Sequence, residues 1–384
     1  MIGNCILFVA ELTGIVWTAC ALALAIGIGR LKLPESEAVT CGEATASLGK
    51  PTVSVLIAAR NEEHNIGRCL EAMSRQDYPD QLREIVVIDD NSTDGTAGIV
   101  KSYLDRIKGL RLIDAGELRP GMAPKKSALI KGIHATTGEI ILTTDADCEP
   151  PPGWITGIVE AFSTETDSVV GYSPLRGAGQ MGKLSRFDGL VSAVISAGSI
   201  GLGIAGSAVG RNFAYRRRAW QDAGGFGGSA AGASGDDDLL LQRIARNGGR
   251  IAFAIDPGTF VPARGKASFT DWWCMKRRHF SAGKRYTPSL KVLGSLLYLF
   301  NPALIAMFVF AMLGHIDPIL AAAVWGAKLS VDGLALARGV RLFNERGWIV
   351  PWLIGEIISP FILTILIPAS LVGKIAWKGR KLER

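Results

Sequence analysis

The sequence contains, close to its first residue, an apolar segment that is long enough to cross a membrane. Residues 2–28 carry a single charged side chain, Glu11, and Arg30 and Lys32 follow directly. About 20 apolar residues in a helix span the hydrocarbon core of a bilayer, so we predict an uncleaved anchor over residues 1–29. A signal peptide would have basic residues before a shorter apolar core. The positive-inside rule places Arg30 and Lys32 in the cytoplasm.

The last third of the sequence contains further apolar segments of similar length. Residues 292–314 and 348–372 are long enough to cross a bilayer. Residues 318–336 form a weaker candidate because Lys328 and Asp332 lie within them. The i,i+4 spacing of these two side chains would let them pair with each other.

The charge of the C-terminal membrane region, predicted over residues 287–384, presents a conflict. If all three segments and the anchor crossed the bilayer, the basic tail over residues 374–384 would lie outside the cell, against the positive-inside rule. Either one C-terminal segment is re-entrant or interfacial, or the rule fails here. Pro351, Pro360 and Pro368 make the last segment the one that we most expect to bend.

The composition agrees with a chain that is part membrane protein and part water-soluble domain. Hydrophobic residues make up 48% and charged residues 20%, and the mean hydropathy is +0.26. The net charge of +7 is typical of cytoplasmic Lys and Arg beside anionic lipid. No zinc finger, RNA-recognition signature or basic repeat indicates a nucleic-acid partner. The six cysteines form no C-x-x-C pair, which favours unpaired thiols on a reducing side.

Between the apolar ends, short apolar runs alternate with helical segments at a spacing of roughly 30 residues. This alternation predicts an α/β domain over residues 51–286 with a parallel, doubly wound, Rossmann-like sheet. A polar linker over residues 30–50 would join the domain to the anchor. The four predicted strands of the first half cover residues 53–58, 85–88, 110–113 and 140–144.

The starts of two helices can also be predicted. Asn61 is a natural N-cap for the helix after the first strand, and Ser92 or Thr93 for the helix after the second. Farther along, residues 184–205 are apolar but interrupted by Ser and Gly. They form a poor span and a fair interfacial or acceptor-facing segment.

Two carboxylates, Asp145 and Asp147, follow the fourth strand. Because side chains alternate along a strand, both are predicted to point the same way at its carboxyl end, where open α/β sheets bind ligands. Such a pair suits a hard divalent cation, which can in turn hold a diphosphate. Taken alone, an Asp-x-Asp is more often a plain acidic turn. Asp89 and Asp90 after the second strand are candidates for binding a nucleoside, and their alternative is an Asx-type turn.

In this order, the motifs resemble those of the membrane-bound family 2 glycosyltransferases of the GT-A fold, over roughly residues 51–286. The resemblance implies a doubly wound, Rossmann-like mixed sheet in a catalytic domain flanked by transmembrane helices. The resemblance assigns metal binding to Asp147, with Asp145 on the ribose or the metal. It assigns the catalytic base to Asp236, with Asp237 as the alternative register. The substrate-binding positions that it implies are Glu62 in the nucleotide loop, Asp89 and Asp90, Lys125 in a Lys-x-x-Ala-Leu stretch, and Asn212 in a Gly-x-Asn-x-Ala-Tyr-Arg-Arg stretch of the acceptor side at residues 210–217.

Several of these residues have ordinary structural alternatives. Glu62 would also suit the first turn of a helix. The acids that follow Gly235 would also suit the positive end of a helix dipole, in the first turn of an amphipathic helix.

One departure from the family pattern concerns residues 275–279. Synthases that extend a polysaccharide usually carry Gln-x-x-Arg-Trp there, whereas this sequence reads Met-Lys-Arg-Arg-His. The missing Gln and Trp disfavour a processive polymerase and favour a single transfer. The general organisation is similar to that of ceramide glucosyltransferase-like and hopanoid-type lipid glycosyltransferases. Arg278 and His279 are the candidates in this stretch for contact with the diphosphate.

The resemblance implies an inverting sugar transfer. A divalent cation, Mg²⁺ or Mn²⁺, would stabilise the departing diphosphate, and Asp236 would accept the proton of the acceptor hydroxyl. The expected donor is a UDP-hexose or UDP-N-acetylhexosamine, and the expected acceptor is a membrane lipid or lipid-linked molecule. The expected location is an inner or plasma membrane of bacterial type, with the catalytic domain in the cytoplasm. The alternatives are a processive polysaccharide synthase and an inactive relative that binds nucleotide-sugar.

Overall fold

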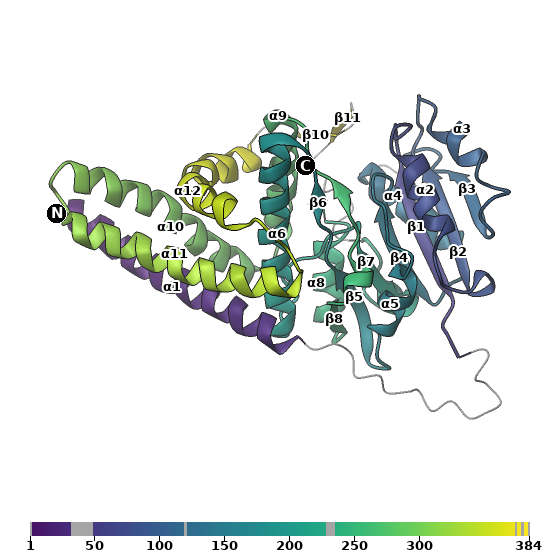
Figure 1. Ribbon diagram of the computed structural model, residues 1–384, viewed down its shortest axis with the longest axis horizontal. Coiled ribbons are helices and arrows are strands. Elements are labelled where there is room, and N and C mark those ends of the chain that lie inside the picture. The colour runs from purple at the N-terminus through teal and green to yellow at the C-terminus, as the bar shows by residue number, and fades with distance from the viewer. Residues whose placement is uncertain are drawn as a thin grey trace.

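The computed structural model describes residues 2–31, 49–118, 121–227, 235–372, 375–377 and 380–382. The molecule has two parts, a domain of sheet and helices and a set of long helices that extends from one side of it (Figure 1). Most of the predicted linker over residues 30–50 lies outside the described residues, as does part of the predicted basic tail over residues 374–384.

A seven-stranded sheet forms the centre of the domain, in the order β3-β2-β1-β4-β7-β5-β8. The four predicted strands are confirmed, and β1 is parallel to both β2 and β4, as β2 is to β3. However, β7 runs antiparallel to both of its neighbours, so the sheet is mixed, as the resemblance to the GT-A fold implies, and not wholly parallel as the alternation of strands and helices predicts. The strands are β1 (Val53–Ala59), β2 (Arg83–Asp89), β3 (Leu110–Asp114), β4 (Ile140–Asp145), β5 (Thr166–Gly171), β7 (Phe213–Arg216) and β8 (Arg250–Ala254).

Helices cover both faces of the sheet and enclose two apolar cores. Side chains alternate along β1, so that Leu56 packs into one core and Val55 and Ile57 into the other. The first core includes residues of α4 and α8, and the second includes residues of α2 and α5. The helices of the domain are α2 (Ile66–Ser74), α3 (Thr96–Lys101), α4 (Pro124–His134), α5 (Trp154–Glu160), α6 (Gly179–Gly201), α7 (Arg217–Asp222), α8 (Asp238–Arg246) and α9 (Phe269–Ser281). The short strands β6 (Leu175–Arg176) and β9 (Ala263–Arg264) pair with each other, as do β10 (Ile375–Trp377) and β11 (Arg380–Leu382).

Both predictions of helix caps are wrong. Asn61 lies five residues before the start of α2 at Ile66 and has a left-handed φ of +50°. Its Oδ1 accepts a hydrogen bond from the backbone N–H of Thr93 at 2.8 Å. Ser92 and Thr93 likewise precede the start of α3 at Thr96. These polar residues bind the loops after β1 and β2 to each other, a contact between distant segments that local propensity does not report.

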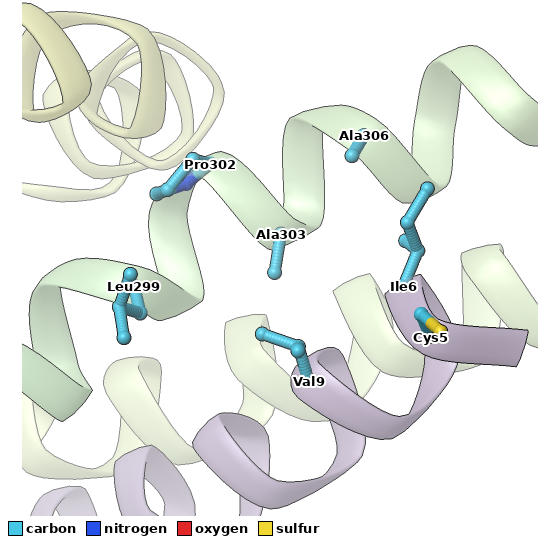
Figure 2. Close-up of a pocket in the computed structure, with 7 residues that line it drawn as sticks. All are labelled: Cys5, Ile6, Val9, Leu299, Pro302, Ala303 and Ala306. Atoms are coloured by element: carbon cyan, nitrogen blue, oxygen red, sulfur yellow. The ribbon is translucent and has the colours of Figure 1, made fainter. Parts of the chain in front are cut away.

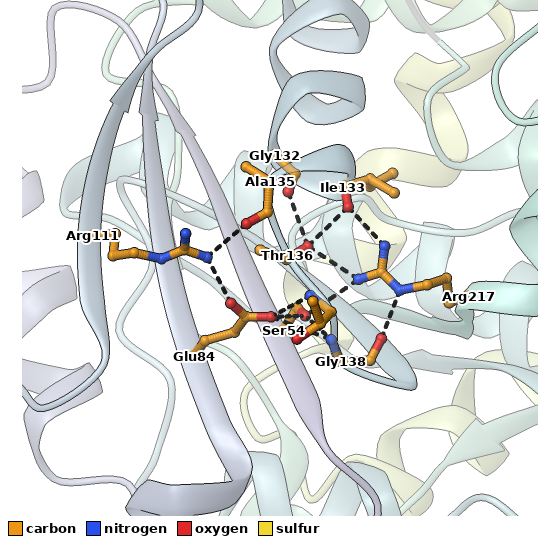
Figure 3. A network of polar contacts seen from close by, with 10 residues as sticks. Ser54, Glu84, Arg111, Gly132, Ile133, Ala135, Thr136, Gly138 and Arg217 are labelled. Atoms are coloured by element: carbon orange, nitrogen blue, oxygen red, sulfur yellow. Dashed lines mark hydrogen bonds and ion pairs between the residues drawn. The ribbon is translucent and has the colours of Figure 1, made fainter.

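A polar network lies at the edge of the sheet where β1, β2 and β4 begin (Figure 3). The Glu84 carboxylate accepts hydrogen bonds from the Ser54 hydroxyl at 2.8 Å and the Gly138 N–H at 3.2 Å, and it pairs with Arg111 at 2.6 Å. Burial alone would raise the pKa of Glu84, but these hydrogen bonds and Arg111 lower it. The Arg217 guanidinium donates to the Gly138 carbonyl at 2.8 Å, which ties the end of β7 to the same edge.

This network corrects the expectation that residues 210–217 all lie on the acceptor side. In the antiparallel pair, Phe213 lies opposite Thr143 and Arg216 lies opposite Ile140. Only the residues just before β7 therefore lie at the carboxyl edge of β4, and Arg217 lies at the far edge.

Four helices are long and apolar enough to cross a membrane: α1 (Ile2–Arg30), α10 (Pro288–Met312), α11 (Pro318–Leu342) and α12 (Ile349–Leu371). Helix α1 packs against α10 and α11, and the three extend side by side from the domain, with the N-terminus at their far end (Figure 1). At its other end α1 meets α6 at a close crossing. A Cβ on Gly27 would lie 1.9 Å from the Gly198 carbonyl oxygen, so this crossing requires glycine.

Three charged side chains inside α11 and α12 form one cluster. Lys328 lies 2.8 Å from Asp332, which confirms the predicted i,i+4 pair, and it also contacts Glu356 of α12. The indole N–H of Trp17 donates to Asp332 at 2.8 Å. Since an isolated charge in lipid is costly, this cluster binds α1, α11 and α12 together. Among the cysteines in the part of the chain that the structure describes, all five are unpaired, as predicted.

Candidate active site

The carboxyl ends of β1, β2 and β4 meet at one edge of the sheet and carry most of the predicted site residues. Asp145 is the last residue of β4 and lies beside Ala58, and Asp89 is the last residue of β2 and lies beside Ala59. Asp147 lies in the turn after β4, so the alternation of side chains along a strand applies to Asp145 alone. The two carboxylates are neighbours because the chain turns sharply, with the Cys148 N–H donating to the Asp145 carbonyl at 3.1 Å.

Lys125 connects two acidic groups that are far apart in the sequence. It follows Pro124, the first residue of α4, and its ammonium points to the carboxyl edge of β4. Its Nζ lies 2.8 Å from Asp145 Oδ1 and 3.0 Å from Asp236 Oδ2. The predicted metal-binding pair and the predicted catalytic base therefore lie on either side of one ammonium group.

The pKa values of Asp145 and Asp147 are shifted in opposite directions. Burial would raise the pKa of Asp145, but Lys125, followed by Arg211 and Arg278, outweighs burial and lowers it to about 2. The pKa of Asp147 is raised by burial, by Asp145 and by Glu62. Asp147 thus lies in a surplus of negative charge that a cation would relieve.

The carboxylates of Asp145 and Asp147 fit a hard divalent cation that takes its other ligands from a substrate. Asp145 and Asp147 offer carboxylate oxygens, the ligands that Mg²⁺ and Mn²⁺ prefer. Within the described ranges no group of three or more His, Cys, Asp or Glu side chains could hold a metal. Mg²⁺ typically uses one or two carboxylates together with substrate phosphates, so two carboxylates suffice when a diphosphate supplies the remaining ligands.

The three acids before Leu239 have different surroundings. Helix α8 begins at Asp238, and Asp237 is its N-cap, whose Oδ1 accepts from the Asp238 N–H at 2.8 Å. The structural alternative of a helix cap therefore holds for Asp237 and Asp238, whereas Asp236 precedes the cap. Asp237 Oδ2 accepts from the Gly210 N–H at 2.9 Å, whereas Asp238 accepts from the Ala208 N–H at 2.7 Å. Asp238 is thereby committed to holding the loop before β7.

A further hydrogen bond connects Asp238 to the start of a membrane helix. The hydroxyl of Tyr286 donates to Asp238 Oδ2 at 3.0 Å, and Tyr286 lies two residues before α10.

Burial, Asp236 and Asp238 raise the pKa of Asp237 to about 7. Lys125 lowers the pKa of Asp236 although burial opposes it, so Asp236 is ionised at neutral pH.

The predicted nucleoside-binding residues lie at the ends of β1 and β2. The Glu62 carboxylate accepts from the Asn65 side chain at 2.8 Å. Asp89 Oδ1 accepts from the Ser92 N–H at 3.2 Å, which is the Asx-type turn named as its alternative. Asp90 is 5% exposed; its carbonyl accepts from Arg60 Nη1 at 2.6 Å and its N–H donates to the Ala59 carbonyl at 2.8 Å. Glu62 and Asp89 remain candidates, while Asp90 is much less accessible.

Asn212 is not placed to bind a substrate, which corrects the expectation from the resemblance. Its side chain is completely buried. Its Oδ1 accepts from the Trp154 indole N–H at 2.9 Å, and its Nδ2 donates to the carbonyls of Tyr172 and Thr259 at 2.8 and 2.9 Å. The amide joins β5, β7, α5 and the turn at residues 257–259 beneath the site.

The basic residues 276–278 of α9 have separate roles. Lys276 forms a 2.5 Å ion pair with Asp188 of α6, and Arg277 donates to backbone carbonyls at the end of α12. Arg278 is the member of the three whose charge acts on Asp145. His279 lies next to it, with Nε2 at 3.5 Å from Arg278 Nη2. Of residues 276–279, only Arg278 and His279 thus remain candidates for contact with the diphosphate.

Two residues of the site were missed in the sequence. Arg211 occupies a variable position of its motif, yet its charge acts on both Asp145 and Asp147, and its Nε donates to the Ser173 hydroxyl at 2.6 Å. A cation directly before β7 was the available signal. Tyr286 gave no signal, because its contact with Asp238 joins elements that are distant in the chain.

Comparisons with known proteins agree with this geometry. Residues 54–222 match the model of the family described as Glycosyl transferase family 2. Glycosyltransferase AglE of Haloferax volcanii is 32% identical over 121 residues, which cover 32% of this chain and 38% of that protein. Beta-monoglucosyldiacylglycerol synthase of Synechocystis sp. is 30% identical over 155 residues, which cover 39% and 32% of the two chains. The chain therefore matches about a third of the length of these curated relatives.

A solved structure is similar over almost the whole chain. It is the mannosyltransferase PcManGT from Pyrobaculum calidifontis in complex with GDP-Man and Mn²⁺, with a TM-score of 0.55 and 22% identity. The similarity covers 91% of this chain and 99% of that one, and it shows that the domain has the GT-A fold.

Proposed function

We propose that this chain, in which residues 54–222 match the model of Glycosyl transferase family 2, moves one sugar from a nucleotide-sugar to a membrane lipid or lipid-linked acceptor, with inversion at the anomeric carbon. The observation that carries the proposal is the position of Lys125 between Asp145 and Asp236. This arrangement supports a site in which donor and acceptor meet: the diphosphate at Asp145 and Asp147, and the attacking hydroxyl at Asp236.

On the donor side, the reaction requires stabilisation of the negative charge that develops on the departing diphosphate. A divalent cation held by Asp147 and Asp145 supplies Lewis-acid stabilisation when it is bound. The positive charges of Lys125 and Arg278 add to this stabilisation. Glu62 and Asp89 contact the nucleoside at the ends of β1 and β2.

On the acceptor side, Asp236 accepts the proton of the attacking hydroxyl. Its ion pair with Lys125 keeps it ionised but also makes it a weak base. When Lys125 turns toward the diphosphate, the ion pair weakens, so the pKa of Asp236 rises and it becomes a stronger base. Lys125 thereby couples donor binding to activation of the acceptor. Asp237, with its pKa raised to about 7, is the alternative base.

The membrane arrangement follows from the two ends of α12. Just before α12, Glu345 pairs with Arg186 and accepts from the Tyr172 hydroxyl at 2.9 Å, both in the catalytic domain. At its other end, Arg277 and Lys284 donate to the carbonyls of residues 369, 371 and 372. Both ends of α12 therefore lie on the side of the domain.

We therefore place α1, α10 and α11 across the bilayer, and α12, which is one continuous helix, along the membrane surface on the side of the domain. This arrangement leaves Arg30 and the basic tail on the same side as the catalytic domain, which removes the conflict with the positive-inside rule. We place that side in the cytoplasm of a bacterial-type inner or plasma membrane. The anchor, the linker, the domain over residues 51–286 and the membrane region over residues 287–384 are kept as predicted.

Two features support a lipid acceptor, and a third supports a single transfer. Tyr286 connects Asp238 to the start of α10, so the acids lie beside the membrane surface. One relative is named for its action on a diacylglycerol lipid. The sequence at residues 275–279 lacks the Gln and Trp of processive synthases.

The deciding experiment is a donor screen with the purified full chain in lipid vesicles. UDP-hexoses, UDP-N-acetylhexosamines and GDP-mannose are supplied with Mg²⁺ or Mn²⁺, and release of the nucleoside diphosphate and the mass of extracted lipids are measured. We expect metal-dependent release with one donor, and a lipid that is heavier by one sugar. Asp147→Ala should abolish both, and Asp105→Ala, at an exposed acid outside the site, should change neither. Absence of release with every donor would refute the proposal.

A further inference from the structure

The hollow between α1 and α10 in the membrane part offers nothing to a charged substrate (Figure 2). It is lined by apolar side chains, among them Val9, Leu299 and Ala303, and by the Cys5 thiol. Such a surface faces lipid and carries no charge that a nucleotide-sugar could use. The groups that bind the donor therefore lie at the carboxyl edge of the sheet, and among the cations there Arg211 occupies the variable position of its motif.

Arg211 lies between two residues with structural roles. The Gly210 N–H donates to Asp237 at 2.9 Å, and the Gly210 carbonyl accepts from the Thr143 hydroxyl at 2.7 Å. Asn212, on the other side, is completely buried beneath the site. The backbone on both sides of Arg211 is therefore fixed, and Arg211 is the residue of these three whose side chain can reach a substrate.

The register of the sheet brings Arg211 to the predicted metal site. Strand β7 is antiparallel to β4, with Phe213 opposite Thr143. The same register, continued by two residues, places Arg211 opposite Asp145. In agreement, the charge of Arg211 acts on both Asp145 and Asp147. Among the described residues, neither carboxylate forms an ion pair with Arg211, so the guanidinium faces the two carboxylates without closing on them.

Ser173 orients the guanidinium of Arg211. Nε of Arg211 donates to the Ser173 hydroxyl at 2.6 Å, and this hydroxyl donates in turn to the Val261 carbonyl at 2.6 Å. Ser173 is buried, and Ala263 of the same segment pairs with Cys148, directly after the predicted metal-binding pair. In the part of the chain that the structure describes, the bond through Nε is the only side-chain hydrogen bond of Arg211. Both terminal amino groups are therefore available to a ligand.

The other cations of the site are less well prepared to hold an anion. Lys125 is already paired with Asp145 and Asp236. The Arg278 side chain contacts only the imidazole of its neighbour, at 3.5 Å, within the described ranges. A guanidinium that is held at one nitrogen presents its remaining N–H groups as a fork, which matches two oxygens of a phosphate. Because Arg211 is oriented in advance, it loses little conformational freedom when it binds.

We propose that Arg211, oriented by Ser173, binds the diphosphate of the donor directly and holds it in the absence of a divalent cation. Arg211 is then a residue that contacts the substrate, and Ser173 is its positioning residue. The inference rests on the proposed function for the identity of its ligand, a nucleoside diphosphate. It has the consequence that the donor can bind before the cation does.

The test measures binding of UDP, GDP and inorganic pyrophosphate to the full chain in detergent, by isothermal titration calorimetry in the presence of EDTA. Pyrophosphate supplies the diphosphate without a nucleoside. Arg211→Met removes the charge, and Arg211→Lys keeps the charge but not the fork. Arg218→Met is the matched control, because Arg218 is exposed just after the far end of β7 and pairs with Asp167 at 3.4 Å.

The wild type and Arg218→Met should bind pyrophosphate and at least one nucleoside diphosphate in EDTA. Arg211→Met should weaken this binding by about 10- to 100-fold, the usual contribution of a hydrogen bond to a charged group, and Arg211→Lys should weaken it less. Binding by the wild type only with Mg²⁺ or Mn²⁺, or equal binding by the wild type and Arg211→Met, would overturn the inference. Should Arg211→Met fail to fold, equal binding by Arg211→Lys and the wild type would overturn it, because the fork would then be unnecessary.

A double-mutant cycle separates the positioning role of Ser173 from a general structural role. Ser173→Ala should weaken binding of pyrophosphate to the chain that carries Arg211. In the Arg211→Met background the same change should have no further effect, because the guanidinium that Ser173 orients is gone. An equal loss in both backgrounds would refute the assignment of Ser173 as a positioning residue.

Failure of the proposed function would look different. In that case the wild type would release no nucleoside diphosphate from any donor, although Arg211 would still bind pyrophosphate in EDTA. If the wild type cleaves a donor but its binding of diphosphates in EDTA is absent or does not depend on Arg211, the function stands and the inference about Arg211 fails.

Discussion

Replacement of Asn212 by Leu tests whether this residue supports the fold or binds a substrate. The side chain is completely buried, and three groups are hydrogen-bonded to it: the Trp154 indole N–H and the carbonyls of Tyr172 and Thr259. Leucine has a similar volume but can neither accept nor donate. The variant therefore leaves the Trp154 indole N–H and the Thr259 carbonyl without a hydrogen bond, whereas the Tyr172 carbonyl still accepts from the Val261 N–H at 3.0 Å.

The expected loss of stability follows from the number of buried polar groups that lose their hydrogen bond. A buried polar group that loses its partner costs about 1–3 kcal/mol, so two of them lower the free energy of unfolding by at least about 2 kcal/mol. For a domain of this size each kcal/mol shifts the melting temperature by about 2–4 °C, so we expect a decrease of about 4–8 °C or more. Asn247→Leu is the control, because Asn247 is exposed and makes a single side-chain bond to the Asp222 carbonyl.

The assay is thermal unfolding in detergent, followed by steady-state kinetics well below the melting temperature. We expect Asn212→Leu to melt early, with KM for the donor close to that of the wild type. Asn247→Leu should melt within about 2 °C of the wild type, since surface changes cost about 0.5 kcal/mol or less. An Asn212→Leu variant that melts normally but has a greatly raised KM would refute the reasoning, because the amide would then contact the substrate.

Three further predictions concern the site and the crossing of α1 and α6. Lys125→Met should lower kcat by about 10²–10³, the usual loss for one electrostatic donor, while Lys125→Arg retains part of the rate; a fall in binding alone would contradict the role in catalysis. The pKa of Asp237 is raised to about 7 from its ordinary value of 3.8, so the stability that its protonated form contributes is present at low pH and is lost as the pH rises through about 7. Asp237→Asn should flatten this slope in melting curves taken between about pH 4 and pH 8, and an unchanged slope would exclude Asp237 as its source. Gly27→Ala should lower thermal stability by about 1–3 kcal/mol because its Cβ meets the Gly198 carbonyl, whereas Gly29→Ala, whose Cβ would lie 3.6 Å from the flexible end of Arg338, should be near neutral; equal effects would refute the close crossing.

Local patterns in the sequence were sufficient for the elements that surround the site. Apolar runs of four to seven residues marked β1 to β4, and the motifs after them marked the edge where Asp89 and Asp145 lie. The spacing of Lys328 and Asp332 was sufficient to predict their pairing. In each case the residues are close in sequence, so the period of a strand or helix determines their geometry.

Contacts between distant segments required the tertiary structure. The direction of β7 places Arg217 away from the acceptor side, and Asn212 is buried beneath the site. The composition of α12 likewise gave no sign that the residues at both of its ends contact the catalytic domain. The meeting of Lys125 with Asp236 belongs to the same class. Hydrophobic periodicity specifies which face of an element is buried, but the order and direction of strands specify which polar side chains meet, and these depend on the packing of the whole chain.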